Sequence, residues 1–271
     1  MGFLAITPAA PLAATIVQIW DWQVAPGPHR LERILPAPGA TLIINLHEDA
    51  TRVYADAPGF PCLRMSGSVL DGPSTRSFVI DTTEQIAVMG VVFRPGGAYP
   101  YFRERVDRLC DRHTDLADLL GDGGARLRER LLDAASPQAR MAIVQRWLRA
   151  RVAEPRLHPA VGAAVAGFDR RPDAEGPAAM AKAVGLSPRR FRELFREHVG
   201  MGPMRYVRLQ RFREVIAATQ RRERIDWARV AADAGFHDQA HLVHEFRRFA
   251  GMTPGAYLAA RDGHVNHIPL P

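Results

Sequence analysis

Residues 195–206 read FREHVGMGPMRY and residues 246–257 read FRRFAGMTPGAY, so nearly the same segment occurs twice, shifted by 51 positions. Six of the twelve positions are identical between the two copies. A shorter match lies upstream, AKAVGL at residues 181–186 and AADAGF at residues 231–236, shifted by 50 positions. The second copy therefore has one additional residue between its two parts, and the repeat indicates two units of the same fold in tandem.

Each copy has the pattern of a short helix, a turn and a longer helix. A short apolar segment ends at Gly185 in the first copy and at Gly235 in the second, and a longer amphipathic segment follows each glycine. Glycine readily adopts the left-handed backbone conformation that ends a helix. Two helices joined by a turn of three or four residues form the helix-turn-helix motif. The sequence therefore predicts two such motifs.

The longer helix of each copy separates apolar from polar residues by face. In the first copy, helical spacing places Phe191, Leu194, Phe195 and His198 on one side and Arg189, Arg192, Glu193 and Arg196 on the other. In the second copy it buries Leu242, Phe246 and Phe249 and leaves Ala240, His244 and Arg247 outward. Such a face is often merely solvated. On a duplicated helix-turn-helix frame, it favours a helix in the major groove, where arginine donates two hydrogen bonds to guanine.

The predicted DNA contacts divide into two groups. We expect six residues to face the bases: Arg189, Arg192, Glu193, Gln239, Ala240 and His244. Three arginines are expected nearer the phosphates: Arg190, Arg196 and Arg247.

Charge is unevenly distributed along the 271 residues. Residues 1–169 hold 18 Arg and 18 acidic residues, whereas residues 170–271 hold 17 Arg and Lys182 against 11 acidic residues, a net charge of +7. The whole positive excess therefore lies in the duplicated segment. A basic surface of this kind is typical of proteins that bind nucleic acids.

The duplicated segment resembles the DNA-binding domain of the AraC/XylS family of bacterial transcription regulators. The resemblance covers about the last 100 residues and includes the second-copy signature from Gly235-Phe236 to Tyr257. It implies that residues 203–219 form one long helix joining the two units, and that double-stranded DNA is the partner. RNA polymerase is a further partner that it implies. His241 and His244 depart from the residues common in the family, which leaves the base preference of the second unit open.

The N-terminal part of the chain reads as a β-rich sandwich or small barrel, which makes the fold class α+β. Short apolar runs bounded by Pro, Gly and Asp predict strands at residues 14–22, 41–46, 52–55, 63–70, 77–81 and 85–93. The glycine-rich block at residues 90–98 carries no lysine of a phosphate-binding loop.

This half resembles the sensor domain of one branch of the same regulators, over most of residues 15–150. The motifs that carry the resemblance are residues 32–36, Ser66-Gly67, residues 79–85 and residues 90–98. The hypothesis is a small-molecule effector bound near the aromatic residues Trp20, Trp22, Phe93 and Tyr99. The alternative is that these aromatics fill a core and that the domain is enzyme-like or only dimerises, leaving DNA binding unregulated by ligand.

Helical spacing begins after Tyr101. It predicts helices at residues 116–120, 125–134, 137–152 and 160–168. The apolar stripe formed by Met141, Val144, Leu148 and Val152 is either core or the seam of a homodimer. Residues 153–159, with two prolines, are the predicted hinge. The expected domains are thus residues 1–155, for sensing or dimerisation, and residues 156–271, for DNA binding.

Other kinds of chemistry find little support, and we expect neither an enzyme nor a cofactor. Nucleophile-elbow, Cys-x-x-Cys and His-Glu-x-x-His motifs are all missing from the sequence. His237, His241 and His244 have helical spacing that suits either zinc or DNA, and His29, His47 and Asp49 are scattered polar residues that could line a pocket. Cys62 and Cys110 form a redox pair or two buried thiols, and neither has the Pro-Cys-His-Arg setting of an alkyl-accepting repair protein. No membrane-length apolar run or secretory signal is present, so we expect a cytoplasmic protein.

Overall fold

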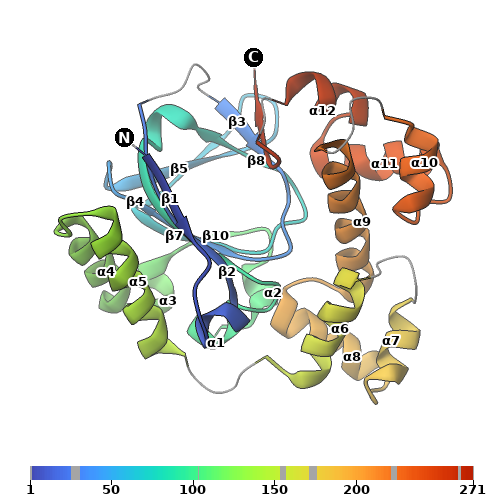
Figure 1. Ribbon diagram of the computed structural model, residues 1–271, viewed down its shortest axis with the longest axis horizontal. Coiled ribbons are helices and arrows are strands. Elements are labelled where there is room, and N and C mark those ends of the chain that lie inside the picture. Colours follow the sequence, from blue (N-terminus) through green and yellow to red (C-terminus); the bar gives the residue numbers. More distant parts are fainter. Residues whose placement is uncertain are drawn as a thin grey trace.

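The chain folds into a β-rich N-terminal part and a helical C-terminal part, as the computed structural model shows in Figure 1. The structure describes residues 2–25, 31–102, 104–152, 157–170, 176–220, 225–261 and 264–270. The predicted α+β class, with strands first and helices after, is confirmed.

Two antiparallel sheets build the N-terminal part. The six-stranded sheet has the order β1 (Gly2–Ile6), β2 (Ile16–Gln23), β9 (Ala87–Phe93), β4 (Thr41–Asn45), β7 (Ser68–Asp71) and β10 (His113–Asp115). The five-stranded sheet has the order β11 (His267–Pro269), β3 (Leu31–Ile34), β8 (Phe78–Asp81), β5 (Ala50–Ala55) and β6 (Cys62–Ser66). The strand pairings among the described residues are antiparallel, as expected for a sandwich whose strands are joined by short turns.

The predicted strand over residues 63–70 is wrong, because the chain changes sheets there. Strand β6 ends at Ser66 in one sheet and β7 begins at Ser68 in the other, with Gly67 between them. Strands β1, β3, β10 and β11 were not predicted. Strands β10 and β11 are only three residues long, too short to show an alternating pattern, and their pairing partners are distant in sequence.

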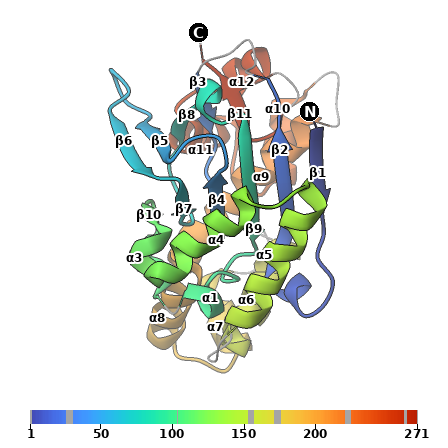
Figure 2. The same cartoon turned by 90° about the vertical axis from the view of Figure 1, so that its left-hand side faces the viewer.

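Helices cover one face of the six-stranded sheet. They are α3 (Leu116–Leu120), α4 (Asp122–Leu132) and α5 (Pro137–Arg151), and Figure 2 shows α4 and α5 lying across the strands. Met141, Val144 and Leu148 of α5 are buried in the same apolar cluster as β2, β4 and β9. The apolar stripe of this helix is therefore core of this chain, and the alternative of a dimer seam is wrong for these three residues.

Two of these helices were predicted closely. The prediction matched α3 residue for residue, and it placed the end of α5 one residue too late. Helix α4 begins three residues before the predicted start, because Gly123 and Gly124, residues that favour loops, belong to its first turn.

The helical part consists of seven helices among the described residues. They are α6 (Pro159–Arg170), α7 (Pro177–Ala183), α8 (Pro188–Val199), α9 (Pro203–Gln220), α10 (Trp227–Asp233), α11 (Gln239–Ala250) and α12 (Pro254–Ala260). The predicted joining helix corresponds to α9, and the predicted helix over residues 160–168 to α6. Much of the predicted hinge, residues 153–156, lies outside the described residues.

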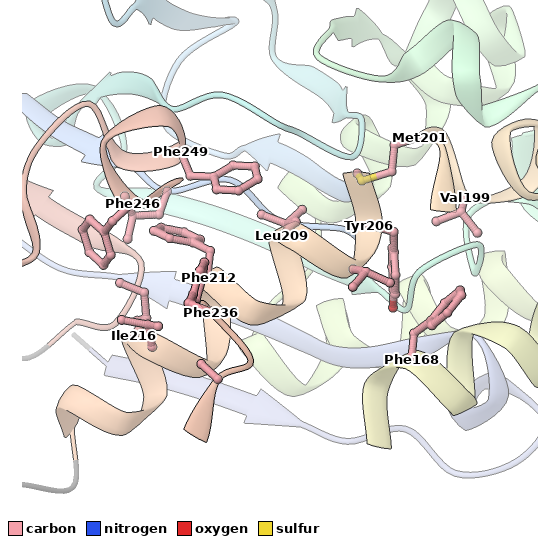
Figure 3. Close-up of a cluster of buried hydrophobic side chains, with 14 of the residues drawn as sticks. Phe168, Val199, Met201, Tyr206, Leu209, Phe212, Ile216, Phe236, Phe246 and Phe249 are labelled. Atoms are coloured by element: carbon pink, nitrogen blue, oxygen red, sulfur yellow. The ribbon is translucent and has the colours of Figure 1, made fainter. Parts of the chain in front are cut away.

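One long helix connects two packed clusters of aromatic side chains. In the middle of α9, Phe212 contacts Phe246 and Phe249 of α11, with ring centroids 5.0 and 5.2 Å from its own. Near its start, Tyr206 packs against Phe168 of α6 (Figure 3). Tyr206 also contacts Phe195 of α8, so α8 and α11 both pack against α9.

Candidate nucleic-acid interface

The two helix-turn-helix units have turns of the same local geometry. Gly185 and Gly235 end the first helix of each unit with φ of +71° and +72°. The next residue closes the turn in both cases: the amide of Leu186 donates to the carbonyl of Ala181, and that of Phe236 to Ala231, each at 2.9 Å. A backbone hydrogen bond of this kind, to a carbonyl of the last helical turn, usually accompanies a glycine in the left-handed conformation at the end of a helix. The sequence repeat is therefore a structural repeat.

The second helix of each unit begins at a capped N-terminus. The Ser187 side chain accepts a hydrogen bond from the amide of Arg190, and that of Asp238 accepts one from the amide of His241 at 2.7 Å. The backbone hydrogen bond from His241 holds the pKa of the Asp238 carboxyl below its usual value. Four residues separate α7 from α8, and five separate α10 from α11. The additional residue predicted from the repeat lies in this second turn.

The inner faces of α8 and α11 are buried as predicted. Phe191, Leu194, Phe195 and His198 of α8, and Leu242, Phe246 and Phe249 of α11, are all buried. Burial lowers the pKa of His198, which therefore favours the neutral ring, as expected of a core histidine.

The outer face of α8 presents its charges to solvent. Arg189, Arg190, Arg192, Glu193 and Arg196 are exposed and line one shallow hollow. Nε of Arg189 lies 3.0 Å from Oε1 of Glu193, one turn along the helix. The Arg189 side chain is 87% exposed, and exposed pairs of this kind contribute only about 0.3–0.5 kcal/mol. Arg189 is thus free to exchange Glu193 for another acceptor at little cost.

The outer face of α11 is less charged. Gln239, Ala240, His244 and Arg247 are exposed, and with Val243 they line a second shallow hollow. All nine residues predicted to contact DNA therefore lie on the outer faces of two equivalent helices. The small Ala240 beside Gln239 leaves room for a flat surface such as a base edge to approach.

One buried carboxylate that the sequence pattern did not reveal holds α11 in place. Glu245 is only 4% exposed, and its carboxylate accepts a hydrogen bond from Nε of Arg208 in α9 at 3.0 Å. It also lies 3.7 Å from Nη1 of Arg248. Sequence spacing places Glu245 beside apolar residues of the inner face, so the only available signal was an acidic residue at a core position.

The first unit has its own polar anchor. The Tyr206 hydroxyl donates to Oδ1 of Asp169 at 2.5 Å, and Gln210 of α9 also donates to that oxygen. Burial and the neighbouring Asp169 carboxylate raise the pKa of Tyr206, so this tyrosine stays protonated and keeps its donor. The equivalent tyrosine of the second unit, Tyr257, donates to the carbonyl of Val265 at 3.2 Å.

The N-terminal domain contacts the last turn of α8. The Tyr99 hydroxyl of α1 (Tyr99–Phe102) donates to Glu197 at 3.2 Å, and its ring lies 4.1 Å from that of His198. Gly200, with φ of +92°, faces α2 (Val106–Leu109) so closely that an added Cβ would lie 3.1 Å from atoms of Val106. The C-terminal end of α8 is thus packed against the β-rich domain.

A carboxylate of the N-terminal domain also lies beside the outer face of α8. Asp107 and Arg105 line the same hollow as the α8 arginines, and Nη2 of Arg196 is 4.0 Å from Oδ2 of Asp107. Hydrogen bonds from Arg105 hold the pKa of the Asp107 carboxyl below its usual range. Arg196, expected near phosphates, is therefore already close to an anionic group.

The histidines and Asp49 that the sequence offered as metal ligands or pocket residues do not form a common site among the described residues. His237 binds its neighbour Asp238, and Nδ1 of His241 accepts from the backbone of His237. Within the part of the chain that the structure describes, no three His, Cys, Asp or Glu side chains are grouped as a metal site. Asp49 pairs with Arg128 at 2.7 Å, and His29 lies outside the described residues.

The two cysteines are free thiols with different surroundings. Cys62 is exposed, which corrects the prediction that both are buried. Cys110 is half-buried against the helical core, and burial raises the pKa of its thiol to about 11.

The four aromatic residues of the effector hypothesis lie in different contacts. Phe93 is buried between Tyr101 and Phe102, Trp20 packs on Gly90, Trp22 packs on Phe3, and Tyr99 packs on His198. For Phe93, the alternative that the aromatics fill a core is confirmed. Across the described segments, no helix is both long enough and apolar enough to cross a bilayer.

Comparison with known proteins identifies the helical part. Residues 180–260 match a family model described as a helix-turn-helix domain, and residues 4–115 match one described as a domain of unknown function, DUF6597. The HTH-type transcriptional regulator GlxA of Rhizobium meliloti (strain 1021) is 35% identical over 88 residues, which is 31% of this chain and 26% of that protein. The chain thus spans about a quarter of the length of this curated relative. The duplicated fold, its exposed basic faces and these matches define a DNA-binding protein of the double helix-turn-helix class.

The solved structures that resemble this chain match either about two fifths or nearly all of it. The DNA-binding domain of AdpA, solved with a target DNA, is 25% identical over 38% of this chain and 93% of its own, with a TM-score of 0.35. An AraC-type transcriptional regulator from Chromobacterium violaceum is 22% identical over 39% of this chain and 94% of its own, with a TM-score of 0.36. ToxT from Vibrio cholerae is 10% identical over 97% of this chain and 96% of its own, with a TM-score of 0.47. On the family match and the duplicated signature, the C-terminal part of this chain is an AraC-type helix-turn-helix DNA-binding domain.

Proposed function

We propose that this regulator binds a specific DNA sequence through α8 and α11, placed in successive major grooves on one face of the duplex. The observation that carries the proposal is the pair of equivalent helices with exposed polar outer faces, held by one rigid helix. The 18 residues of α9 correspond to about 27 Å at 1.5 Å per residue. Successive major grooves on one face lie about 34 Å apart, and α8 and α11 contact this connector at different positions, Tyr206 and Phe212.

The roles we propose for the exposed residues follow from their chemistry. Arg189, Arg192 and Glu193 of the first unit are base-reading residues, as are the three residues of the second unit, Gln239, Ala240 and His244. Arginine binds guanine bidentately, and glutamine binds adenine in the same manner. Arg190, Arg196 and Arg247 are proposed to bind phosphates, which fix the position on the duplex and carry little sequence information.

Paired substitutions test this division. Arg192→Ala should cost roughly 1–3 kcal/mol on the operator and relax the preference at one or two base pairs. Arg247→Ala should weaken operator and random DNA about equally, and should reduce the slope of log affinity against log salt by about one. The measurement is a mobility shift with the full chain on an operator selected from random duplexes. Equal losses on operator and random DNA for both variants would refute the division.

We propose further that a small molecule bound by the N-terminal domain changes the affinity for DNA. The contact of Tyr99 and Val106 with the last turn of α8 supports this proposal, because a rearrangement of the N-terminal domain reaches the reading helix directly. The N-terminal domain also contains buried polar atoms that have no hydrogen-bond partner in the described part of the chain: Oγ1 of Thr51, Oγ of Ser68 and Oε2 of Glu84. Such atoms are rare in folded proteins and are suited to bind a polar ligand.

Thermal-shift screening of metabolites against the full chain tests the effector proposal. A ligand selective for the native state stabilises it by about 2.7 kcal/mol at a hundredfold excess over its dissociation constant. Thr51→Val, which removes one unpartnered hydroxyl with little change in shape, should reduce the shift that a hit produces. A saturating hit that leaves operator affinity unchanged would refute the coupling, since a ligand shifts an equilibrium only through differential affinity.

A further inference from the structure

The last described strand of the chain lies in the sheet of the N-terminal domain. Strand β11 pairs with β3, with His267 opposite Ile34 and Ile268 opposite Arg33. The ladder continues beyond the strands, because the amide of Leu35 donates to the carbonyl of Asn266 and that of Leu270 to Leu31, each at 2.9 Å. Figures 1 and 2 show this C-terminal strand beside β3, at the edge of the five-stranded sheet.

The side chains of this contact are apolar inside and polar at the rim. Ile268 is 0% exposed and Leu35 is buried, and both belong to the same apolar cluster as the core of the helical domain. At the rim, Nδ1 of His267 lies 2.7 Å from Oε2 of Glu32, 235 positions away in the sequence. The tail therefore completes a core to which both domains contribute.

The tail is also fixed to the second helix-turn-helix unit. The hydroxyl of the buried Tyr257 in α12 donates to the carbonyl of Val265, two residues before the strand. Arg261 donates from Nη1 to the carbonyl of Thr219 near the end of α9 at 2.9 Å. The position of β11 is thus transmitted to the end of α9 and to α12, whose Tyr257 ring contacts Phe246 of α11.

The first unit is held by a separate contact, at the opposite end of α9. There the last turn of α8 packs on Tyr99 and Val106, as described above. Neither contact covers the outer faces, because Arg192 on α8 and Gln239 and His244 on α11 are exposed. The N-terminal domain therefore holds both units while leaving their outer faces open.

We propose that β11 is a latch that positions the second reading helix for simultaneous binding of both units to DNA. Ile268 and its partner strand β3 are positioning elements, since they touch no predicted DNA contact. The proposal rests on the DNA-binding role of α8 and α11. When the latch is open, the second unit loses the strand pairing that joins it to the N-terminal domain, and α11 is positioned only by its remaining contacts, such as those with α9.

Two variants of the full chain test the latch. The first lacks residues 266–271, which removes β11 but keeps the carbonyl of Val265. The second carries Ile34→Cys and His267→Cys in a Cys62→Ser background, so that oxidation closes the latch covalently. These two residues are directly opposed between the flanking hydrogen-bonded pairs Leu35–Asn266 and Arg33–Ile268, the position where side chains approach most closely in an antiparallel ladder.

Binding is measured on the selected operator and on the same duplex with the half-site of α11 scrambled. The deletion should lower affinity for the intact operator by about tenfold, which is a part of the gain of about 10²–10⁴ that joined sites can have, because α9 still joins the two units. It should leave affinity for the scrambled duplex unchanged. The oxidised cysteine variant should bind the intact operator as the wild type does.

Three results would overturn the proposal. One is unchanged affinity of the deletion variant for the intact operator. Another is a gain in affinity of the deletion variant for that operator. The third is a loss of operator binding when the double-cysteine variant is oxidised, restored by a reductant. The second and third results would show that the latch inhibits DNA binding. Slow modification of Cys110, half-buried against the helical core, confirms that the deletion variant keeps its fold. Failure of the proposed function would give a different result. The Arg192→Ala variant, whose latch is intact, would then not differ from the wild type in its preference for the operator.

Discussion

Replacing Glu245 by alanine is expected to weaken the second half of the DNA-binding surface without touching any predicted DNA contact. Glu245 points into the core, opposite to His244 and Arg247, and connects α11 to α9 through Arg208. Alanine removes the acceptor and leaves the Arg208 guanidinium without its hydrogen-bonded partner. The inner face of α11 then keeps only its apolar contacts with α9.

The magnitude follows from the burial of the two partners. A hydrogen bond to a charged group contributes about 1.5–3 kcal/mol, and loss of one partner of a fully buried ion pair costs about 3–5 kcal/mol. Glu245 is buried, but the Arg208 side chain is 34% exposed and regains water when its partner is lost. We therefore expect a loss of about 2 kcal/mol in the free energy of unfolding, near the lower of these ranges.

Urea denaturation and operator binding measure the two consequences. Glu245→Gln is the matched control, because its amide oxygen retains an acceptor for Arg208 at nearly the same volume. The alanine variant should lose affinity for the intact operator but bind as wild type when the α11 half-site is scrambled. The glutamine variant should fall between wild type and alanine in both measurements. Equal loss of affinity on both duplexes, or a fully stable alanine variant, would refute the positioning role of this carboxylate.

Three further predictions concern folding, reactivity and salt. Nε of Arg140 binds the carboxylate of Asp21 at 2.5 Å, and the Asp21 side chain is 1% exposed. Arg140→Met should therefore lower the free energy of unfolding, measured in urea, by about 3–5 kcal/mol, because it leaves an unpaired buried charge. Adding Asp21→Leu should recover much of this loss, and additive losses would contradict the pairing. At pH 8 a thiol reagent should modify the exposed Cys62 quickly and Cys110 slowly, since burial raises the pKa of Cys110 to about 11 and keeps it protonated; mass spectrometry showing equal rates would contradict that burial. Operator affinity should fall steeply between 50 and 200 mM salt, as counterion release requires, and a flat salt dependence in fluorescence anisotropy would exclude phosphate contacts.

The sequence was most informative where the structure depends on local pattern. The repeat of residues 195–206 in residues 246–257 predicted the two units, since helix capping by glycine and the spacing of apolar residues are local properties. The same reasoning placed the nine predicted contact residues on exposed faces. It did not find Glu245, because an acidic residue in an apolar stripe has a meaning only when its partner on another helix is known.

Contacts between distant segments were beyond the sequence pattern. Strand β11 has three residues, and it is a strand because β3 lies beside it. The pattern predicted one strand over residues 63–70, whereas Gly67 separates β6 from β7, because the hydrogen-bond partners of the chain change there. Cys110 and Asp107 are ordinary residues of a short helical turn in the sequence, and only folding brings them against the helical domain.

The central claim is that two equivalent helices read two separate parts of one operator. Selection of bound sequences from random duplexes, carried out in parallel with the wild type, Arg192→Ala and Gln239→Ala, tests it most directly. The wild type should select two clusters of specified base pairs whose centres are one helical turn apart. Arg192→Ala should relax only one cluster and Gln239→Ala only the other. If both variants relaxed the same cluster, or neither changed the selected sequence, the assignment of α8 and α11 as the two reading helices would be contradicted.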